Sequence, residues 1–177
     1  KGGVGKSTTC VNLAFALKQL GLRVGLLDLD VYGPSLPELI PMIGDEVTGT
    51  VEKLIIPFQH GGVQLMSVGY LMNGEAALIR APIATGMVVQ LLTEVCWGEL
   101  DILLVDTPPG TGDVLLTVTQ HLQIDGAVLM TTANAMSVAD LQKGIQLFQK
   151  VEVPTLAVCQ NMSVLPCERC GHANELF

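Results

Sequence analysis

Three groups of residues in this sequence have types and spacings suited to chemistry, and the first is the opening stretch Lys-Gly-Gly-Val-Gly-Lys-Ser-Thr, residues 1–8. Its glycines let the backbone curl tightly, so that successive N–H groups can point at an anion. Lys6 supplies a charge for phosphates, and the Ser7 hydroxyl suits Mg²⁺. The helix that follows directs its positive end at the same place. The stretch therefore predicts a phosphate-binding loop rather than a glycine-rich turn capped by Ser7.

Carboxylates form the second group, because acids end two apolar runs. Asp28 and Asp30 follow the run 24–27, and Asp106 follows the run 102–105. Open α/β sheets bind ligands at the carboxyl ends of their strands, which is where these acids would lie. Phosphoryl transfer needs charge neutralisation and a polarised water, and acids beside a phosphate loop can supply both. The alternative, that each Asp only caps a turn, stays open, most of all for Asp28.

Cys167 and Cys170 are the third group, separated by Glu168 and Arg169. Two thiolates at this spacing can hold one metal ion or one edge of a cluster. Arg169 can favour the thiolate forms. A redox pair lacks its usual place at a helix start, and haem attachment would need His directly after Cys170. A zinc half-site joined by His172, and an incidental pair, stay open.

The elements that must position these residues follow from apolar spacing. Helical spacing predicts helices over about 7–20, 84–95 and 137–150, the last with Ser137 as its cap. A further helix is expected to follow the loop 107–113 and to end at about residue 121. Short apolar runs predict strands over 24–27, 63–68, 102–106, 126–130 and 155–159, with 54–56 pairing near the second of these. Residues 36–62 give no clear pattern. The alternation predicts an α/β fold, a doubly wound and mostly parallel sheet with helices on both faces.

Composition limits the class of protein. A length of 177 residues predicts one domain over 1–177. Hydrophobic residues make up 49% and aromatic residues 4%, which indicates an aliphatic core, and no apolar run approaches a membrane span. A net charge of −8 argues against a broad nucleic-acid footprint. Three further cysteines stand in apolar runs and are expected to be buried thiols in a reducing compartment: Cys10, Cys96 and Cys159.

The chain begins inside a motif. The pattern G-x-x-x-x-G-K-[ST] would place its leading Gly one residue before Lys1. We therefore expect a fragment that lacks its first strand. Any targeting segment would lie upstream. The cytoplasm is the expected compartment, with a mitochondrion or plastid open.

Four stretches in order resemble the Mrp/ApbC family: 1–8, 28–35, 106–113 and 160–163. That family consists of P-loop ATPases that carry iron–sulfur clusters, within the wider group of MinD, ParA and the nitrogenase iron protein. The resemblance covers nearly the whole chain. It implies that the C-terminal end is missing as well, so that the ATPase domain over 1–177 is expected to be incomplete at both ends. It implies ATP, Mg²⁺ and an iron–sulfur cluster as cofactors. A 4Fe-4S cluster takes four protein ligands and each chain offers only Cys167 and Cys170 at suitable spacing, so we expect such a cluster to bridge a homodimer. The resemblance also implies apo-proteins as cluster recipients. The net charge and the length of the apolar runs argue against nucleic acid and membrane as partners.

The resemblance also implies a role for individual residues. Lys1 would reach the nucleotide of the partner subunit, and Lys6 would act within the phosphate cradle formed by Gly2, Gly3, Val4, Gly5, Lys6, Ser7 and Thr8. Asp30 would lie near the attacking water and Asp28 near the Mg²⁺ shell. Asp106 would be the Walker B acid. Gly110 would sense the γ-phosphate, Asn161 would contact adenine, and Cys167 and Cys170 would hold the cluster.

The resulting expectation is a slow ATP hydrolase that binds a cluster and transfers it to apo-proteins. A MinD- or ParA-like positioning switch is the first alternative, and a kinase or ligase is the second. The pair Cys167 and Cys170 distinguishes a cluster carrier from the first alternative, because a positioning switch needs no thiolate pair. The family usually has Cys-Pro-x-Cys, so Glu168 alters the stiffness of this loop but keeps both ligands.

Overall fold

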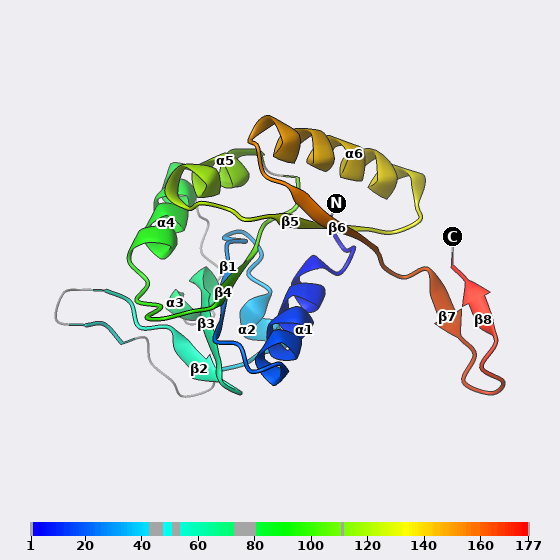
Figure 1. Cartoon of the computed structure of the whole chain (residues 1–177), viewed down its shortest axis with the longest axis horizontal. Coiled ribbons are helices and arrows are strands. Elements are labelled where there is room, and N and C mark those ends of the chain that lie inside the picture. The colour runs from blue at the N-terminus through cyan, green and yellow to red at the C-terminus, as the bar shows by residue number, and fades with distance from the viewer. Residues whose placement is uncertain (1, 43–47, 51–53, 73–80, 111, 177) are drawn as a thin grey trace. The chain divides into compact units, whose positions relative to one another are not determined.

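The computed structural model describes residues 2–42, 48–50, 54–72, 81–110 and 112–176, which Figure 1 draws in colour. The residues group into two compact units. The large unit is Ser7–Leu122. The small unit joins the residues before Ser7 to the chain from Gln123 onward. The expectation of a single ATPase domain stays a prediction.

A four-stranded sheet organises the large unit, in the order β2-β3-β1-β4. β1 (Val24–Asp28) lies between β3 (Val63–Ser67) and β4 (Ile102–Asp106) and runs parallel to both. β2 (Phe58–His60) joins β3 antiparallel at the edge. The three predicted parallel strands are confirmed. β2 lies in the stretch that the sequence left unread.

The predicted helices of the large unit are confirmed with small shifts at their ends. The helices are α1 (Lys6–Gln19), α2 (Leu36–Leu39), α3 (Val68–Leu71), α4 (Ala81–Thr93) and α5 (Gly112–His121). The two single-turn helices α2 and α3 were not predicted, because four residues are too few to show helical spacing. Ile55 pairs with Gly49 and Val95 in isolated bridges, so the expected pairing of 54–56 near β3 is wrong.

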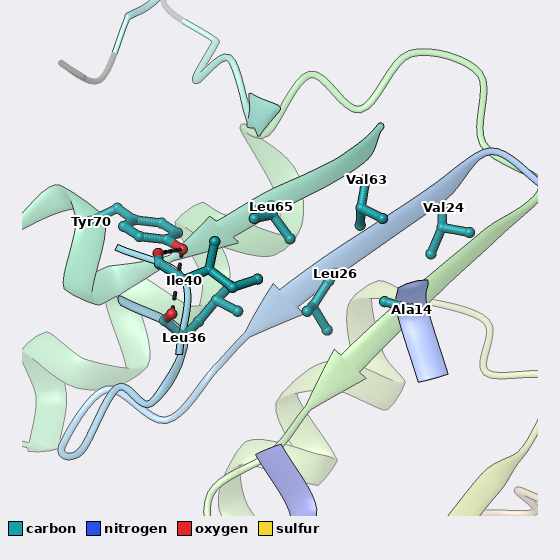
Figure 2. Close-up of a cluster of buried hydrophobic side chains, with 8 residues drawn as sticks. All are labelled: Ala14, Val24, Leu26, Leu36, Ile40, Val63, Leu65 and Tyr70. Carbon is teal, nitrogen blue, oxygen red and sulfur yellow. Dashed lines mark hydrogen bonds between the residues drawn. The ribbon is translucent and has the colours of Figure 1, made fainter. Parts of the chain in front are cut away.

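One cluster of buried side chains in the large unit packs on one face of the sheet. Figure 2 shows its buried side chains, which come from α1, β1, α2, the turn after α2, β3 and α3: Ala14, Val24, Leu26, Leu36, Ile40, Val63, Leu65 and Tyr70. The Tyr70 hydroxyl donates to the carbonyl of Ile40 at 2.9 Å, so the aromatic residue is buried with its polar end satisfied. This contact fixes the end of α2, which directly follows the loop that carries Asp30.

β4 is less buried than expected. Its apolar residues 102–105 are only half-buried, whereas every residue of β1 is buried. The difference follows from position, because β4 is an edge strand of the sheet in the large unit and β1 is internal.

The small unit contains a second parallel pair, β5 (Ala127–Thr131) with β6 (Thr155–Gln160), joined by α6 (Ala135–Lys150). These elements confirm the predicted strands and helix. A hairpin of β7 (Val164–Pro166) and β8 (Ala173–Glu175) ends the described chain, and strands of three residues were too short to predict. The predicted class, α/β with a mostly parallel sheet, is confirmed.

The cap of α6 differs from the prediction. Asn134 is the N-cap, and its side chain accepts from the Met136 N–H at 2.9 Å. Ser137 lies inside the helix, buried, where its hydroxyl accepts from the Thr132 hydroxyl at 2.9 Å. The prediction of Ser137 as cap is therefore wrong, because Asn caps at least as well and occurs three residues earlier.

Two further findings concern burial. Cys96 is exposed, so its expected burial is wrong, while Cys10 and Cys159 are half-buried. Among the described residues, no helix has the length and apolar character needed to cross a membrane.

Candidate functional site

The phosphate loop has the left-handed backbone that its glycines predict. Gly3 and Gly5 have φ of 76° and 87°, values that residues with a side chain rarely adopt. Helix α1 begins at Lys6, directly after the loop. Ser7 and Thr8 therefore lie in the first turn of α1, where unpaired N–H groups favour an anion. The roles expected of Gly2 and Lys6 stay predictions, and Lys1 lies outside the described residues.

Polar residues stand side by side at the carboxyl edge of the large sheet. Asp28 is in register with Ser67 of β3 on one side and with Asp106 of β4 on the other. All three are buried. Asp28 and Asp106 also line a small cavity together with Ser7 of α1. The structure thus brings together two of the three predicted acids and the predicted Mg²⁺ hydroxyl.

Asp28 holds the loop that follows β1. Its Oδ1 accepts from the Asp30 N–H at 2.9 Å, and its Oδ2 accepts from the N–H groups of Ser35 and Leu36 at 3.0 and 3.1 Å. The Ser67 hydroxyl donates to the same Oδ2 at 3.1 Å. Both carboxylate oxygens therefore organise this chain's own loop. The place expected for Asp28 near the Mg²⁺ shell stays a prediction.

Burial changes the acidity of this edge. Burial raises the pKa of Asp28 to about 6, and the charge of Asp106 adds to the increase, while the hydrogen bonds from Asp30, Leu36 and Ser67 oppose it. Burial also raises the pKa of the Cys10 thiol well above its usual range, with Asp106 and Asp28 adding to the effect. Cys10 therefore stays a neutral thiol beside the acids.

Asp30 is less buried than Asp28 and stands in the loop itself. Its Oδ1 accepts from the Gly33 N–H at 3.0 Å, which closes a short turn around the carboxylate. Gly110, in the loop after β4, has φ of 72° and so needs glycine's freedom. The roles expected of Asp30 and Gly110 stay predictions.

Asn161 lies against the phosphate loop within the small unit. Its Nδ2 donates to the carbonyl of Val4 at 3.0 Å, and its Oδ1 accepts from the Met162 N–H at 2.9 Å. A Cβ at Gly5 would lie 2.5 Å from that Nδ2, so Gly5 is needed for close approach as well as for its backbone. The adenine contact expected of Asn161 stays a prediction.

Cys167 and Cys170 lie at the tip of the β7–β8 hairpin. The Cys167 N–H donates to the His172 carbonyl, and the Gly171 N–H donates to the Cys167 carbonyl, both at 2.8 Å. Gly171 has φ of 70°, which closes the turn. Cys170 is exposed and Cys167 is half-buried. In the described part of the chain, His, Cys, Asp and Glu form no group of three or more that could hold a metal, so the hairpin offers two thiols.

The hairpin turn favours a thiolate at Cys167. The N–H groups of Arg169 and Cys170, and the Cys170 side chain, lower the pKa of Cys167. The expected contribution of Arg169 thus comes from its backbone N–H. A loop whose amides face a sulfur suits a metal-ligating thiolate.

Three contributors to the site were not predicted from the sequence. Ser67 donates to Asp28, and its only sequence signal is a polar residue near the end of the predicted strand 63–68. The Val4 carbonyl accepts from Asn161, and the Thr131 carbonyl accepts from the Asn161 N–H at 2.8 Å. Backbone carbonyls carry no residue-type signal, so no pattern could have predicted them.

Curated relatives match the chain over its entire length. An iron–sulfur cluster carrier protein from Escherichia coli (strain K12) is 44% identical over 178 residues, covering 100% of this chain and 48% of the relative. The iron–sulfur cluster transfer protein NUBPL of Mus musculus is 45% identical over 180 residues, covering 100% of this chain and 56% of the relative. The chain therefore spans about half the length of the curated relatives it matches.

Solved structures place the fold. A nucleotide-binding protein from Archaeoglobus fulgidus in complex with ADP has a TM-score of 0.85 and 36% identity, covering 100% of this chain and 69% of that one. The septum site-determining protein MinD from Pyrococcus horikoshii, with Mg-ADP, has a TM-score of 0.67 at 19% identity, covering 92% and 67%, and shows the fold alone. The family model described as ParA, NUBPL iron-transfer P-loop NTPase, matches residues 1–177. With the phosphate loop, the paired acids and this match in agreement, the chain belongs to the NUBPL iron-transfer P-loop NTPase family.

Proposed function

We propose that the protein is an ATP-binding and ATP-hydrolysing carrier of an iron–sulfur cluster, which it passes to apo-proteins. One observation carries the proposal: the same chain holds a phosphate loop and an exposed two-cysteine hairpin whose turn stabilises a thiolate. The names of the relatives from Escherichia coli and Mus musculus support the cluster role. The ADP in the Archaeoglobus fulgidus protein supports the nucleotide role.

The nucleotide would be held by the phosphate loop. The backbone N–H groups of residues 2–8 and the Lys6 ammonium would bind the phosphates, and Asn161 would contribute beside the base. The Ser7 hydroxyl would hold Mg²⁺, with Asp28 and Asp106 nearby on the cavity that all three line. Bound Mg²⁺ neutralises phosphate charge. ATP is favoured over GTP because Met162, Ser163 and Val164 follow Asn161, where guanine readers usually have an Asp.

Hydrolysis would depend on Asp30. This carboxylate stands in a loop fixed by Asp28 and is less buried, so it can polarise a water. Asp106 would act as the Walker B acid and Gly110 as the sensor of the γ-phosphate. Lys1 would reach the nucleotide of a partner subunit. These assignments make the chain a hydrolase in which positioning and charge neutralisation supply most of the catalysis.

The cluster would be cargo held by Cys167 and Cys170. A 4Fe-4S cluster takes four protein ligands and one chain offers two at suitable spacing, so the cluster would bridge a homodimer. The free cysteines suit a reducing compartment, the cytoplasm or an organelle. The acidic charge of −8 argues against nucleic acid as a partner, and no membrane partner is proposed.

A positioning switch of the MinD type shares the fold but has no use for the thiolate pair. The deciding experiment uses full-length protein purified anaerobically, with iron content and ultraviolet–visible absorbance measured before and after addition of an apo-aconitase acceptor. We expect bound iron, a thiolate-to-iron absorbance band and gain of aconitase activity. The double variant Cys167→Ala, Cys170→Ala should lose all three, while Cys96→Ala, also at an exposed cysteine, should keep them. Iron-free protein after anaerobic reconstitution would contradict the carrier function.

A further inference from the structure

Asn161 lies between the phosphate loop and the β7–β8 hairpin in the chain's small unit. The proposed function assigns a role to each of these two parts but no link between them. The residues before Ser7 belong to the same compact unit as Gln123–Phe177. Asn161 follows β6 directly, and the β7–β8 hairpin begins three residues later at Val164. Within this unit, Asn161 therefore links the residues before Ser7 to the cysteine hairpin.

The orientation of the Asn161 amide is fixed from both ends. Its Nδ2 faces a carbonyl, that of Val4 at 3.0 Å, and its Oδ1 faces an N–H, that of Met162 at 2.9 Å. Turning the amide over would set oxygen against oxygen and N–H against N–H. The backbone of Asn161 is held as well, because its N–H donates to the Thr131 carbonyl at the end of β5 at 2.8 Å.

The contact with the phosphate loop is close as well as hydrogen-bonded. A Cβ at Gly5 would approach the Asn161 Nδ2 to 2.5 Å, so Asn161 packs directly on the left-handed segment of the loop. The Val4 carbonyl that accepts from Asn161 belongs to the peptide whose N–H is that of Gly5. The bond thereby orients a peptide of the phosphate cradle.

Asn161 is also connected to the hairpin, through the two residues that follow it. Met162 has φ of 55°, a left-handed conformation that is unfavourable for a residue with a side chain, and its N–H donates to the Asn161 side chain. The next residue, Ser163, accepts from the Leu176 N–H at 3.1 Å, which closes the hairpin at its base. At the tip, the backbone of Cys167 forms hydrogen bonds with the backbone of His172 and Gly171. Hydrogen bonds and the intervening peptide bonds therefore connect the Val4 carbonyl to the base of the hairpin whose turn carries both thiols.

We propose that Asn161 is a positioning residue that couples the conformation of the phosphate loop to that of the β7–β8 hairpin, so that nucleotide binding changes the hairpin and the hairpin changes nucleotide affinity. Such coupling is reciprocal for any two sites that bias one shared element. Its significance for cluster transfer rests on the proposed function, but the coupling itself requires only that the nucleotide binds the phosphate loop.

The test measures amide hydrogen exchange over residues 162–176 in the full-length, cluster-free protein, with and without saturating ADP. We expect ADP to change exchange in this segment of the wild type. Asn161→Asp keeps the acceptor for Met162 but replaces the donor to Val4 with a second oxygen. Asn161→Ala removes the side-chain bonds without adding charge near phosphates. Both variants should weaken ADP affinity about tenfold, the effect of one lost hydrogen bond, and lose the ADP-dependent change in exchange even at saturation.

Asn134→Asp is the matched control, since it makes the same substitution in the same unit while preserving the bond to Met136. It should bind ADP and respond in exchange like the wild type, and thermal melting should show that all variants are folded. An ADP response retained in both Asn161 variants would overturn the coupling, as would no ADP response in the wild type. Neither result depends on iron, so absence of a cluster would contradict the carrier function alone.

Discussion

At the scale of single residues, Asp28 has the most consequential environment in the large unit. It is 2% exposed and accepts four hydrogen bonds from the loop after β1 and from Ser67. Burial nevertheless dominates and raises its pKa from 3.8 to about 6, so the folded protein binds this proton more tightly than the unfolded chain does. The resulting contribution to stability is fully present below about pH 4 and is lost as the pH rises through 6.

We therefore predict that Asp28→Asn flattens the dependence of the free energy of unfolding on pH between 4 and 6. The pKa difference sets an upper limit of about 3 kcal/mol on the change that disappears. Urea unfolding of nucleotide-free protein at a series of pH values measures it, with the exposed Asp125→Asn as control. The other titratable groups facing Asp28 are Asp106, Cys10 and Tyr70. An unchanged slope in Asp28→Asn would refute the raised pKa of Asp28 as the source of the pH dependence.

Lys6 and Asp30 are expected to separate binding from hydrolysis. Lys6→Ala removes a cation from the phosphate cradle and should weaken ATP binding about 10- to 100-fold, the effect of losing a charged hydrogen bond. Asp30→Ala should leave affinity nearly unchanged and slow hydrolysis about 100-fold or more, since it removes the group that polarises water. Equilibrium binding and turnover are measured on both, with Lys150→Ala, at an exposed helix end, as the charge control. Equal loss of binding in both variants would refute this division of roles.

At the scale of elements, the cap of α6 gives a direct test of local structure. Asn134→Ala removes the acceptor for the Met136 N–H and should lower the free energy of unfolding by about 1 kcal/mol. Asn134→Asp should keep the stability of the wild type, because the aspartate oxygen caps equally well. Urea unfolding of the three proteins decides between them. A loss of stability in Asn134→Asp as large as in Asn134→Ala would show that the amide, and not the cap, is what matters.

The elements that the sequence predicts are those long enough to show a period. Apolar runs located β1, β3 and β4, and helical spacing located α1 and α4. The short elements α2, α3, β2, β7 and β8 were not predicted, because three or four residues cannot distinguish a hydrophobic period of 2 from one of 3.6. A different limit applies to the site. Residue types indicated Asp28 and Asn161, but their hydrogen-bond partners are mostly backbone groups, which carry no residue-type signal and which only the fold brings close.

At the scale of the whole molecule, the two thiols of one hairpin account for only half of a four-iron site. We predict that full-length protein carrying a cluster is a homodimer with one cluster for every two chains. Cys167 and Cys170 from each chain would supply the four ligands, because a twofold axis presents the same patch twice. Burial, with a further contribution from the charges of Asp106 and Asp28, raises the pKa of the Cys10 thiol and keeps it neutral, so Cys10 is poorly suited to complete a site within one chain.

Mass in solution and iron per chain, measured together under anaerobic conditions, test this assembly. The expected result is a dimer with about two iron atoms per chain, since a four-iron cluster would be shared by two chains. Cys167→Ala, Cys170→Ala should lose iron and shift the mass toward the monomer, whereas Cys159→Ala, at a half-buried cysteine outside the hairpin, should do neither. A monomer holding four iron atoms would refute the bridge. So would a double variant that keeps its iron and its dimer, because the hairpin would then be neither the ligand set nor the contact between chains.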